Sequence, residues 1–398
     1  MDQAVNYIAL AIPVFFLLIG IEAWIAHRRG KPWYRLNDSI NDLSMGVLQQ
    51  ITVVFSKSAI YFGYFLIYEN WHLFDWPMDR PWTWIVGFLG VDFCYYWFHR
   101  LSHEINIIWG SHIAHHQSEE YNLTVALRQG AFQPFFSAVF YWPLALLGLD
   151  PIAFLALSSF NTLYQFWIHT RAIGQMWRPF ELIFNTPSHH RVHHGCNPQY
   201  IDRNHGGTLI IWDRLFGTFE PEGEEVVYGV TKPLRSWNPI WANVHYFVEL
   251  AEKARKARRW RDKLLVWIMP PHWNPPDVAD DTPVETPLNG FRYDADAPRP
   301  GRLYALVQFA AALAATVGLL FFGPKLPLPA QAALAIWTIW TLVNVNAVFE
   351  QPPWLRLSEP LRLLAAPLWL VLAPPLPHAV SAVVLIWSIG SLIAWRPV

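Results

Sequence analysis

Long apolar stretches alternate along the chain with shorter polar connections, and each has about the length of a bilayer-spanning helix. Seven such stretches are predicted as membrane spans, at residues 4–24, 43–68, 82–98, 132–149, 151–167, 303–322 and 330–349. The Pro- and Trp-rich tail 361–395 has room for one or two more. This pattern predicts an all-α polytopic membrane protein, and a very apolar soluble protein is the disfavoured alternative.

The composition agrees with a membrane location. Of 398 residues, 53% are hydrophobic and only 15% are charged, whereas a typical soluble domain carries about 25% charged residues. The net charge of −1 argues against a nucleic-acid partner held by bulk electrostatics. Two cysteines are too few for a disulfide framework.

Positive residues predict the orientation in the membrane. Four basic residues follow the first span directly: Arg28, Arg29, Lys31 and Arg35. Because cytosolic loops are enriched in Lys and Arg, this loop is expected in the cytosol. Counting spans onward places segments 99–131 and 168–300 on the same side. The span at 132–149 and its partner at 151–167 would then form a hairpin that enters the membrane and returns.

Three regions follow from this layout. Residues 1–81 are N-terminal transmembrane helices, residues 82–300 a catalytic region, and residues 301–398 a C-terminal transmembrane region with a single histidine, His378. Within the middle region, seven basic residues lie between Lys253 and Lys263, and apolar residues follow at helical spacing. This segment is either an amphipathic helix on anionic headgroups or a solvated basic helix.

The histidines are distributed very unevenly. Eleven of the sixteen lie between positions 99 and 205. Within them, residues spaced by three or four positions share one face of a helix. There are three such clusters: His99 and His103; His112, His115 and His116; and His190, His193 and His194. One further histidine, His169, stands alone.

These nine histidines are predicted to be metal ligands. Imidazole suits Fe, Zn, Cu and Ni, and nine nitrogens are too many for one ion. The clusters therefore predict a di-metal site at the cytosolic face, although a lone buried histidine such as His169 is often only a core residue. His189 points about 100° away from His190 on a helix and is expected to support the ligands. His205 lies in a turn, Asn-His-Gly-Gly, and its role stays open.

Carboxylates near the clusters are few. Glu104 directly follows His103 and is a candidate catalytic residue, with simple surface exposure as the alternative. None of the clustered histidines follows a glutamate at the Glu-x-x-His spacing of soluble di-iron bundles. The His-Glu-x-x-His motif of zinc proteases is also absent. The metal chemistry expected here therefore depends on histidine alone.

The sequence in and around the clusters resembles that of the fatty acid hydroxylase/sterol desaturase superfamily of membrane di-iron oxygenases. The resemblance covers about residues 85–220 and is carried by DFCYYWFHRLSHE, HIAHHQSEEYNLTVALRQ, NTPSHHRVHHG and IIWDRLFGTF. It implies the same nine ligands and gives Glu104 a catalytic role. Some relatives carry a further histidine four positions after the one at His169, where this chain has Ile173.

The resemblance also implies a function. It favours the branch that acts on ether lipids, where hydroxylation beside the ether oxygen of an alkylglycerol yields a fatty aldehyde and glycerol. Such an enzyme would use two Fe ions, O2, a membrane lipid substrate and an external electron donor, either tetrahydrobiopterin or a redox protein. The apolar hairpin 132–167 is expected to line the path of the lipid chain. The membrane would be the inner membrane in a bacterium or the endoplasmic reticulum in a eukaryote.

Two alternatives remain open from the sequence. One is another hydroxylase or desaturase of the same superfamily, acting on a sterol, a fatty acyl chain or an aminolipid. The other is a polytopic metal transporter, which would need polar residues along successive spans. The predicted spans hold few polar residues beyond Gln49, Gln50, Lys57 and Asp92, so transport is the weaker alternative.

Overall fold

The computed structural model describes residues 7–279, 285–372 and 378–395. Within these ranges the chain is helical and contains no β-strand, only two isolated bridges, Phe184–Leu209 and Gly195–Tyr228. The predicted all-α fold is confirmed. The helices of the first half are α1 (Tyr7–Arg28), α2 (Leu36–Trp71), α3 (Pro81–Glu104), α4 (Asn106–His116), α5 (Gln133–Ala138), α6 (Trp142–Leu147) and α7 (Pro151–Trp167).

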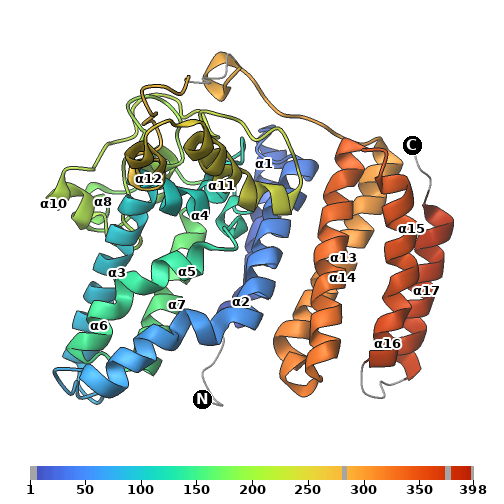
Figure 1. The fold of residues 1–398 in the computed structure, drawn as a ribbon, viewed down its shortest axis with the longest axis horizontal. Coiled ribbons are helices and arrows are strands. Elements are labelled where there is room, and N and C mark those ends of the chain that lie inside the picture. Colours follow the sequence, from blue (N-terminus) through green and yellow to red (C-terminus); the bar gives the residue numbers. More distant parts are fainter. Residues whose placement is uncertain (1–6, 280–284, 373–377, 396–398) are drawn as a thin grey trace.

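Shorter helices and loops make up the middle of the chain. They are α8 (Arg178–Ile183), α9 (Pro187–His193), α10 (Ile211–Phe216), α11 (Pro239–Lys256) and α12 (Trp260–Ile268). The C-terminal helices are α13 (Arg299–Phe322), α14 (Leu328–Glu350), α15 (Leu355–Ala365), α16 (Trp369–Leu372) and α17 (His378–Ala394). Figure 1 shows α2, α3, α13 and α14 with their axes broadly parallel, while α8, α10, α11 and α12 gather at one end.

Four helices in the described residues are long and apolar enough to cross a membrane. They are Leu10–Arg28, Leu36–Trp71, Arg299–Lys325 and Leu328–Glu350. Each coincides with a predicted span, so four of the seven predictions are confirmed.

Of the other three predicted spans, the one at 132–149 is wrong as a single helix. The stretches 82–98 and 151–167 are each one continuous helix, and their crossing of a membrane stays a prediction. The stretch 132–149 is divided between α5, the 3-10 turn Val139–Tyr141 and α6, because Pro134 and Pro143 each remove a backbone donor and begin a new helix. Helix α7 coincides with the predicted stretch 151–167 and has 17 residues. Helix α3 contains the whole predicted stretch 82–98 and continues beyond it for about one and a half turns that carry histidines and charged side chains.

The C-terminal helices pack on α2 rather than forming a separate body. Apolar residues of α2, including Ile40, Val47 and Ile51, share one buried cluster with residues of α13 and α14. Ala305 and Ala312 of α13 belong to this cluster, and small residues of this kind let helix backbones approach closely within a membrane. The C-terminal region therefore supports the long helix that also flanks the histidine-bearing helices.

A buried ion pair lies inside the C-terminal group of helices. Arg362 of α15 is fully buried, and its Nε donates to Glu359 Oε2 at 2.9 Å. A second guanidinium nitrogen donates to Gln308 of α13 at 2.8 Å, and a third to Thr341 of α14 at 3.1 Å. Glu359 also accepts hydrogen bonds from Tyr304 and from Asn344. One side chain thus ties α13, α14 and α15 together through polar contacts.

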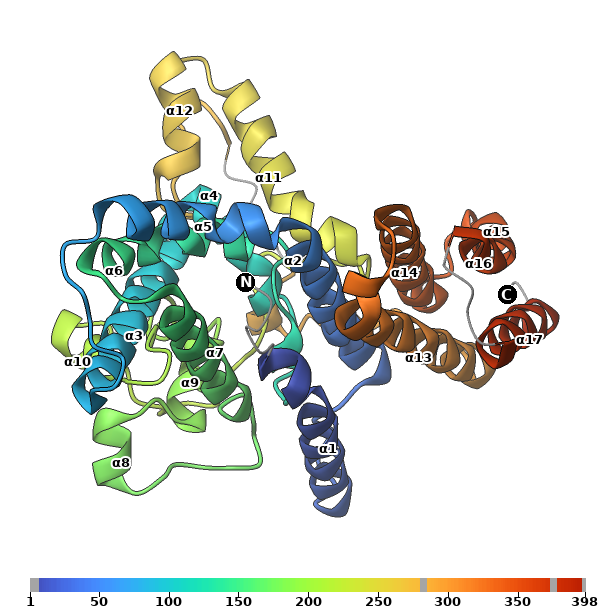
Figure 2. The same ribbon diagram turned by 90° about the horizontal axis from the view of Figure 1, so that it is seen from below.

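Helices α11 and α12 project from the rest of the molecule (Figure 2). The helix predicted to follow the basic segment is present as α12, and Trp260, Leu264 and Ile268 are 79%, 68% and 60% exposed. Exposed apolar side chains beside basic ones suit an interfacial helix. Contact of α12 with lipid headgroups stays a prediction.

The Arg362 network predicts a specific stability effect. Replacing Arg362 with Met leaves Glu359 buried without its cation, which costs about 3–5 kcal/mol for a buried pair. We expect Arg362→Met to lower the thermal unfolding temperature of the purified chain in detergent. The double variant Arg362→Met/Glu359→Gln should recover part of the loss, because it removes the orphaned charge. A single variant as stable as the original chain would contradict the structural role of this pair.

Candidate metal centre

Four segments carry the predicted ligands to one place. His99 and His103 lie one turn apart near the end of α3. Ile105 interrupts the helix with an extended backbone (φ −124°, ψ 118°), so α4 begins in a new direction and returns its histidines to those of α3. The other two segments supply the remaining ligands, with His169 just after α7, His190 and His193 in α9, and His194 at the end of α9.

The structure divides these nine histidines into two groups. In each group the candidate ligand atoms lie within 4.8 Å of one another, and all nine residues are buried. The first group consists of His99, His103, His112, His116 and His193. The second consists of His115, His169, His190 and His194.

Neighbouring residues serve different groups. His115 and His116 are adjacent in α4 but belong to separate groups, and so do His193 and His194. Successive residues of a helix point about 100° apart, so each pair can face two different ions. The groups are themselves adjacent, because the rings of His116 and His194 stack with their centres 4.5 Å apart.

Backbone and side-chain oxygens fix the orientation of most of these rings. Five Nδ1 atoms lie at hydrogen-bonding distance from an oxygen that can only accept. The pairs are His99 with the His205 carbonyl (2.8 Å), His112 with Gln133 Oε1 (2.8 Å), His115 with the Arg128 carbonyl (2.7 Å), His169 with the Gln165 carbonyl (2.7 Å) and His193 with the Arg203 carbonyl (3.0 Å). Each of these Nδ1 atoms therefore carries the proton, and Nε2 presents a lone pair. His103 Nδ1 lies 3.6 Å from the carboxylate of Asp202.

The Nε2 atoms then meet at distances that suit a shared cation. His99 Nε2 and His112 Nε2 are 3.1 Å apart, and His169 Nε2 and His115 Nε2 are 3.3 Å apart. Since all four Nδ1 atoms hold the proton, neither pair can form a hydrogen bond. Metal–nitrogen bonds of about 2.1 Å place ligands at right angles about 3 Å apart. The spacing is that of nitrogens sharing an ion.

The protonation states and unpaired atoms fit the same interpretation. Burial and the neighbouring histidine His103 lower the pKa of His112 to about 3, and burial lowers the pKa of His169 to about 4. These imidazoles are therefore neutral near pH 7, as a metal ligand must be. The buried Nε2 atoms of His103, His193 and His194 have no hydrogen-bond partner. An all-nitrogen donor set of this kind fits two ions of the iron, zinc, copper and nickel class.

Glu104 lies outside both groups. Its carboxylate accepts from Arg100 Nε at 2.9 Å, and its side chain is 37% exposed. Arg100 also donates to the Tyr96 hydroxyl at 3.3 Å. A catalytic role for Glu104 stays a prediction. At position 173, where some relatives carry a histidine, the isoleucine offers no ligand, and the second group has four members.

Two buried aspartates were not identified as supports by the sequence. Asp92 of α3 accepts from Asn161, from the backbone of Thr208 and Leu209, and from Trp212 Nε1 at 2.9 Å. Asp213 holds a neighbouring part of the same loop through the backbone nitrogens of residues 205 and 206. A charged residue within an apolar stretch was the available signal for Asp92, but the nearest of its partners, Asn161, is 69 positions away.

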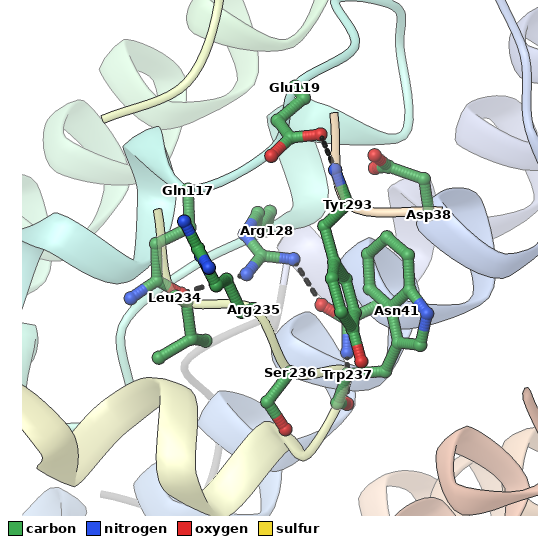
Figure 3. A pocket seen from close by; sticks show the side chains of 10 residues that line it. All are labelled: Asp38, Asn41, Gln117, Glu119, Arg128, Leu234, Arg235, Ser236, Trp237 and Tyr293. Atoms are coloured by element: carbon green, nitrogen blue, oxygen red, sulfur yellow. Dashed lines mark hydrogen bonds between the residues drawn. The ribbon is translucent and has the colours of Figure 1, made fainter. Parts of the chain in front are cut away.

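Figure 3 shows a polar pocket around Arg128, the residue whose carbonyl accepts from His115 of the second group. Arg128, whose carbonyl orients His115, donates from its guanidinium to Asn41 and Asp42 of α2 and to Gln117. Further lining residues include Glu119, Trp237 and Tyr293. This network ties the outer side of His115 to α2.

The division into two groups predicts the effect of substituting adjacent residues. His193→Ala removes a ligand from the first group, and His194→Ala removes one from the second. We expect each variant to retain one of the two ions and the double variant to retain neither, as measured by metal analysis of the purified chain. Loss of both ions from each single variant, with the fold intact, would contradict two separate groups.

Comparisons with known proteins agree with this centre. Residues 84–218 match the family described as Fatty acid hydroxylase. The chain is 41% identical to alkylglycerol monooxygenase of Xenopus tropicalis over 91% of this chain and 82% of that protein. It is 39% identical to the Homo sapiens protein of the same name, over 92% of this chain and 82% of the human protein. It is 30% identical to ornithine lipid hydroxylase OlsE of Rhizobium tropici, over 41% of this chain and 50% of that protein.

No solved structure matches the chain. The relatives are lipid-modifying enzymes, and nothing in the comparisons favours the transporter alternative. The match to the Xenopus and human proteins extends well beyond the histidine clusters, over most of both chains. The chain therefore belongs to the alkylglycerol monooxygenase family, within the fatty acid hydroxylases, and is an oxygen-dependent lipid monooxygenase.

Proposed function

We propose that this chain cleaves the ether bond of alkylglycerols by hydroxylating the carbon beside the ether oxygen. One observation carries the proposal: two adjacent, buried, all-histidine groups lie in a chain that is about 40% identical to alkylglycerol monooxygenases over nine-tenths of its length. The nine histidines would hold two iron ions.

The reaction balances with one external two-electron donor. One oxygen atom of O2 enters the C–H bond, and the other leaves as water with two protons and two electrons. The hemiacetal formed then breaks its C–O bond to give a fatty aldehyde and glycerol. We propose a reduced pteridine, tetrahydrobiopterin, as the donor. Bound iron would supply the O2 activation, which amino-acid side chains cannot perform alone.

The chain's own residues orient the site and exclude water from it. Hydrogen-bonded Nδ1 atoms keep the imidazoles in one tautomer, and the burial of all nine removes competing solvent. Tyr121, fully buried, forms a wall of the second group, with its ring centre 5.2 Å from that of His194. Its hydroxyl donates to the Ile168 carbonyl at 3.0 Å. We retain Glu104 as a proposed catalytic carboxylate beside His103.

We propose that the hairpin α5–α7 forms the route from the bilayer to the first group. Gln133 at the start of α5 holds His112 Nδ1, while Phe135 two positions later is 40% exposed. Trp142 at the start of α6 is 39% exposed. We propose that an alkyl chain enters along this apolar surface. The active face would lie in the cytosol, on an inner membrane or the endoplasmic reticulum.

Hydroxylation of an aminolipid is the second candidate. The match to an ornithine lipid hydroxylase favours it, but that match covers 41% of this chain, against 91% for the Xenopus alkylglycerol monooxygenase. The wider match favours ether cleavage.

Aldehyde release from an alkylglycerol tests the proposal. The iron-loaded chain should form fatty aldehyde only when tetrahydrobiopterin and O2 are present, and an acylglycerol ester of equal chain length should yield none. His115→Ala should abolish turnover, because it removes a ligand of the second group. The matched control is His272→Ala, an exposed histidine outside both groups, and it should retain full activity. If the iron-loaded chain releases no aldehyde under these conditions, the proposal that alkylglycerols are the substrate is wrong.

A further inference from the structure

A tenth histidine lies beside the first group without belonging to it. His205 is fully buried in the loop between α9 and α10, and neither of its ring nitrogens has a hydrogen-bond partner. The Asp202 carbonyl is close to the ring but outside hydrogen-bonding geometry. Leaving a buried polar group unpaired costs about 1–3 kcal/mol, so this side chain needs an explanation.

The ring of His205 faces three members of the first group. Its centre lies 5.1 Å from that of His103, 5.6 Å from that of His193 and 5.7 Å from that of His99. Contacting rings within the group are 4.3 to 5.5 Å apart. Two imidazoles bound to one ion through nitrogens about 2.1 Å from it have centres roughly 4.5 to 6.5 Å apart. By its ring-centre distances His205 can reach the same ion. Its nitrogens lie outside the 4.8 Å set of the group, so the ring would turn toward the ion on binding.

The loop is built to hold this residue. Asp213 accepts from the backbone nitrogens of His205 and Gly206, both at 2.7 Å. Asn204 adopts a left-handed conformation (φ 56°), and its side chain donates to the His189 carbonyl at 3.0 Å. A Cβ on Gly206 would lie 2.5 Å from the Leu209 carbonyl oxygen, so this position excludes larger residues. The position of the His205 backbone is thus fixed from both sides.

The backbone and the imidazole of His205 have separate roles. The backbone carbonyl accepts from His99 Nδ1 at 2.8 Å, and any residue at this position would supply that carbonyl. A buried histidine with a purely structural role uses its ring in hydrogen bonds, as His245 does with the carbonyls of Trp241 and Ala242. The imidazole of His205 makes no such bond, which leaves its lone pair available to a cation.

We propose that the His205 imidazole is a sixth nitrogen ligand of the ion held by the first group. This rests on the proposed two-metal function. The first group would then offer six nitrogens and the second four. Six nitrogens fill an octahedral ion, so the open coordination positions would belong to the second ion. The two ions would therefore have different tasks.

Cobalt loading of the full-length chain in detergent tests this proposal. Six-coordinate Co(II) absorbs visible light weakly, and Co(II) with fewer ligands absorbs more strongly. In His205→Phe, which keeps the bulk of the ring, we expect stronger absorption and an affinity for one of the two ions at least about 10-fold lower in chelator competition. The metal-free variant should unfold at the temperature of the metal-free original or above it, because no hydrogen bond is lost and an unpaired buried polar group is removed. Added imidazole should restore the original spectrum in His205→Gly.

His245→Phe is the matched control and should change neither the spectrum nor the affinity. If His205→Phe binds both cobalt ions with the original affinity and spectrum, the proposal is wrong. It is also wrong if the metal-free variant is destabilised as much as the loaded one, because that result identifies a packing role. If the original chain binds no cobalt, the proposed function fails first, and this proposal fails with it.

Discussion

The convergence of imidazole lone pairs in a space without water is the constraint on which the rest of this structure depends. Nine buried histidines form two groups, and in each the candidate ligand atoms lie within 4.8 Å of one another. Where the Nδ1 atoms hold the proton, facing Nε2 atoms repel one another unless a cation lies between them. Metal binding would therefore be coupled to the stability of this region as well as to its chemistry.

The surrounding structure supplies the rigidity that this arrangement needs. Carbonyls of distant loops orient the rings from outside, and buried polar residues in turn fix those loops. Asp92 and Asp213 hold the loop that supplies a carbonyl to His99, and the Arg128 network ties His115 to α2. The C-terminal helices pack on that same α2. Supports of this kind usually contribute as much to a metal site as the ligands themselves.

Helical spacing predicted which histidines come together because it is a local property. His112, His115 and His116 must share one region of a helix wherever α4 lies, and the four longest apolar segments must be helices in a membrane. The division of adjacent histidines between two groups depends on how α3, α4, α7 and α9 pack. That packing cannot be predicted from the spacing of the histidines alone. The role of Asp92 likewise depends on a loop 116 positions away. Pro134 and Pro143 are local signals for the helix breaks within 132–149. The prediction of one span there followed the apolar composition of the stretch and overlooked these two prolines.

Iron content and Mössbauer spectroscopy of the full chain loaded with iron-57 test the central claim most directly. We expect about two irons per chain in two distinguishable environments, because the two groups differ in their number of nitrogens. A single iron, or two irons in one identical environment, would contradict the division into two groups. A folded chain that retains no iron would contradict the metal centre itself.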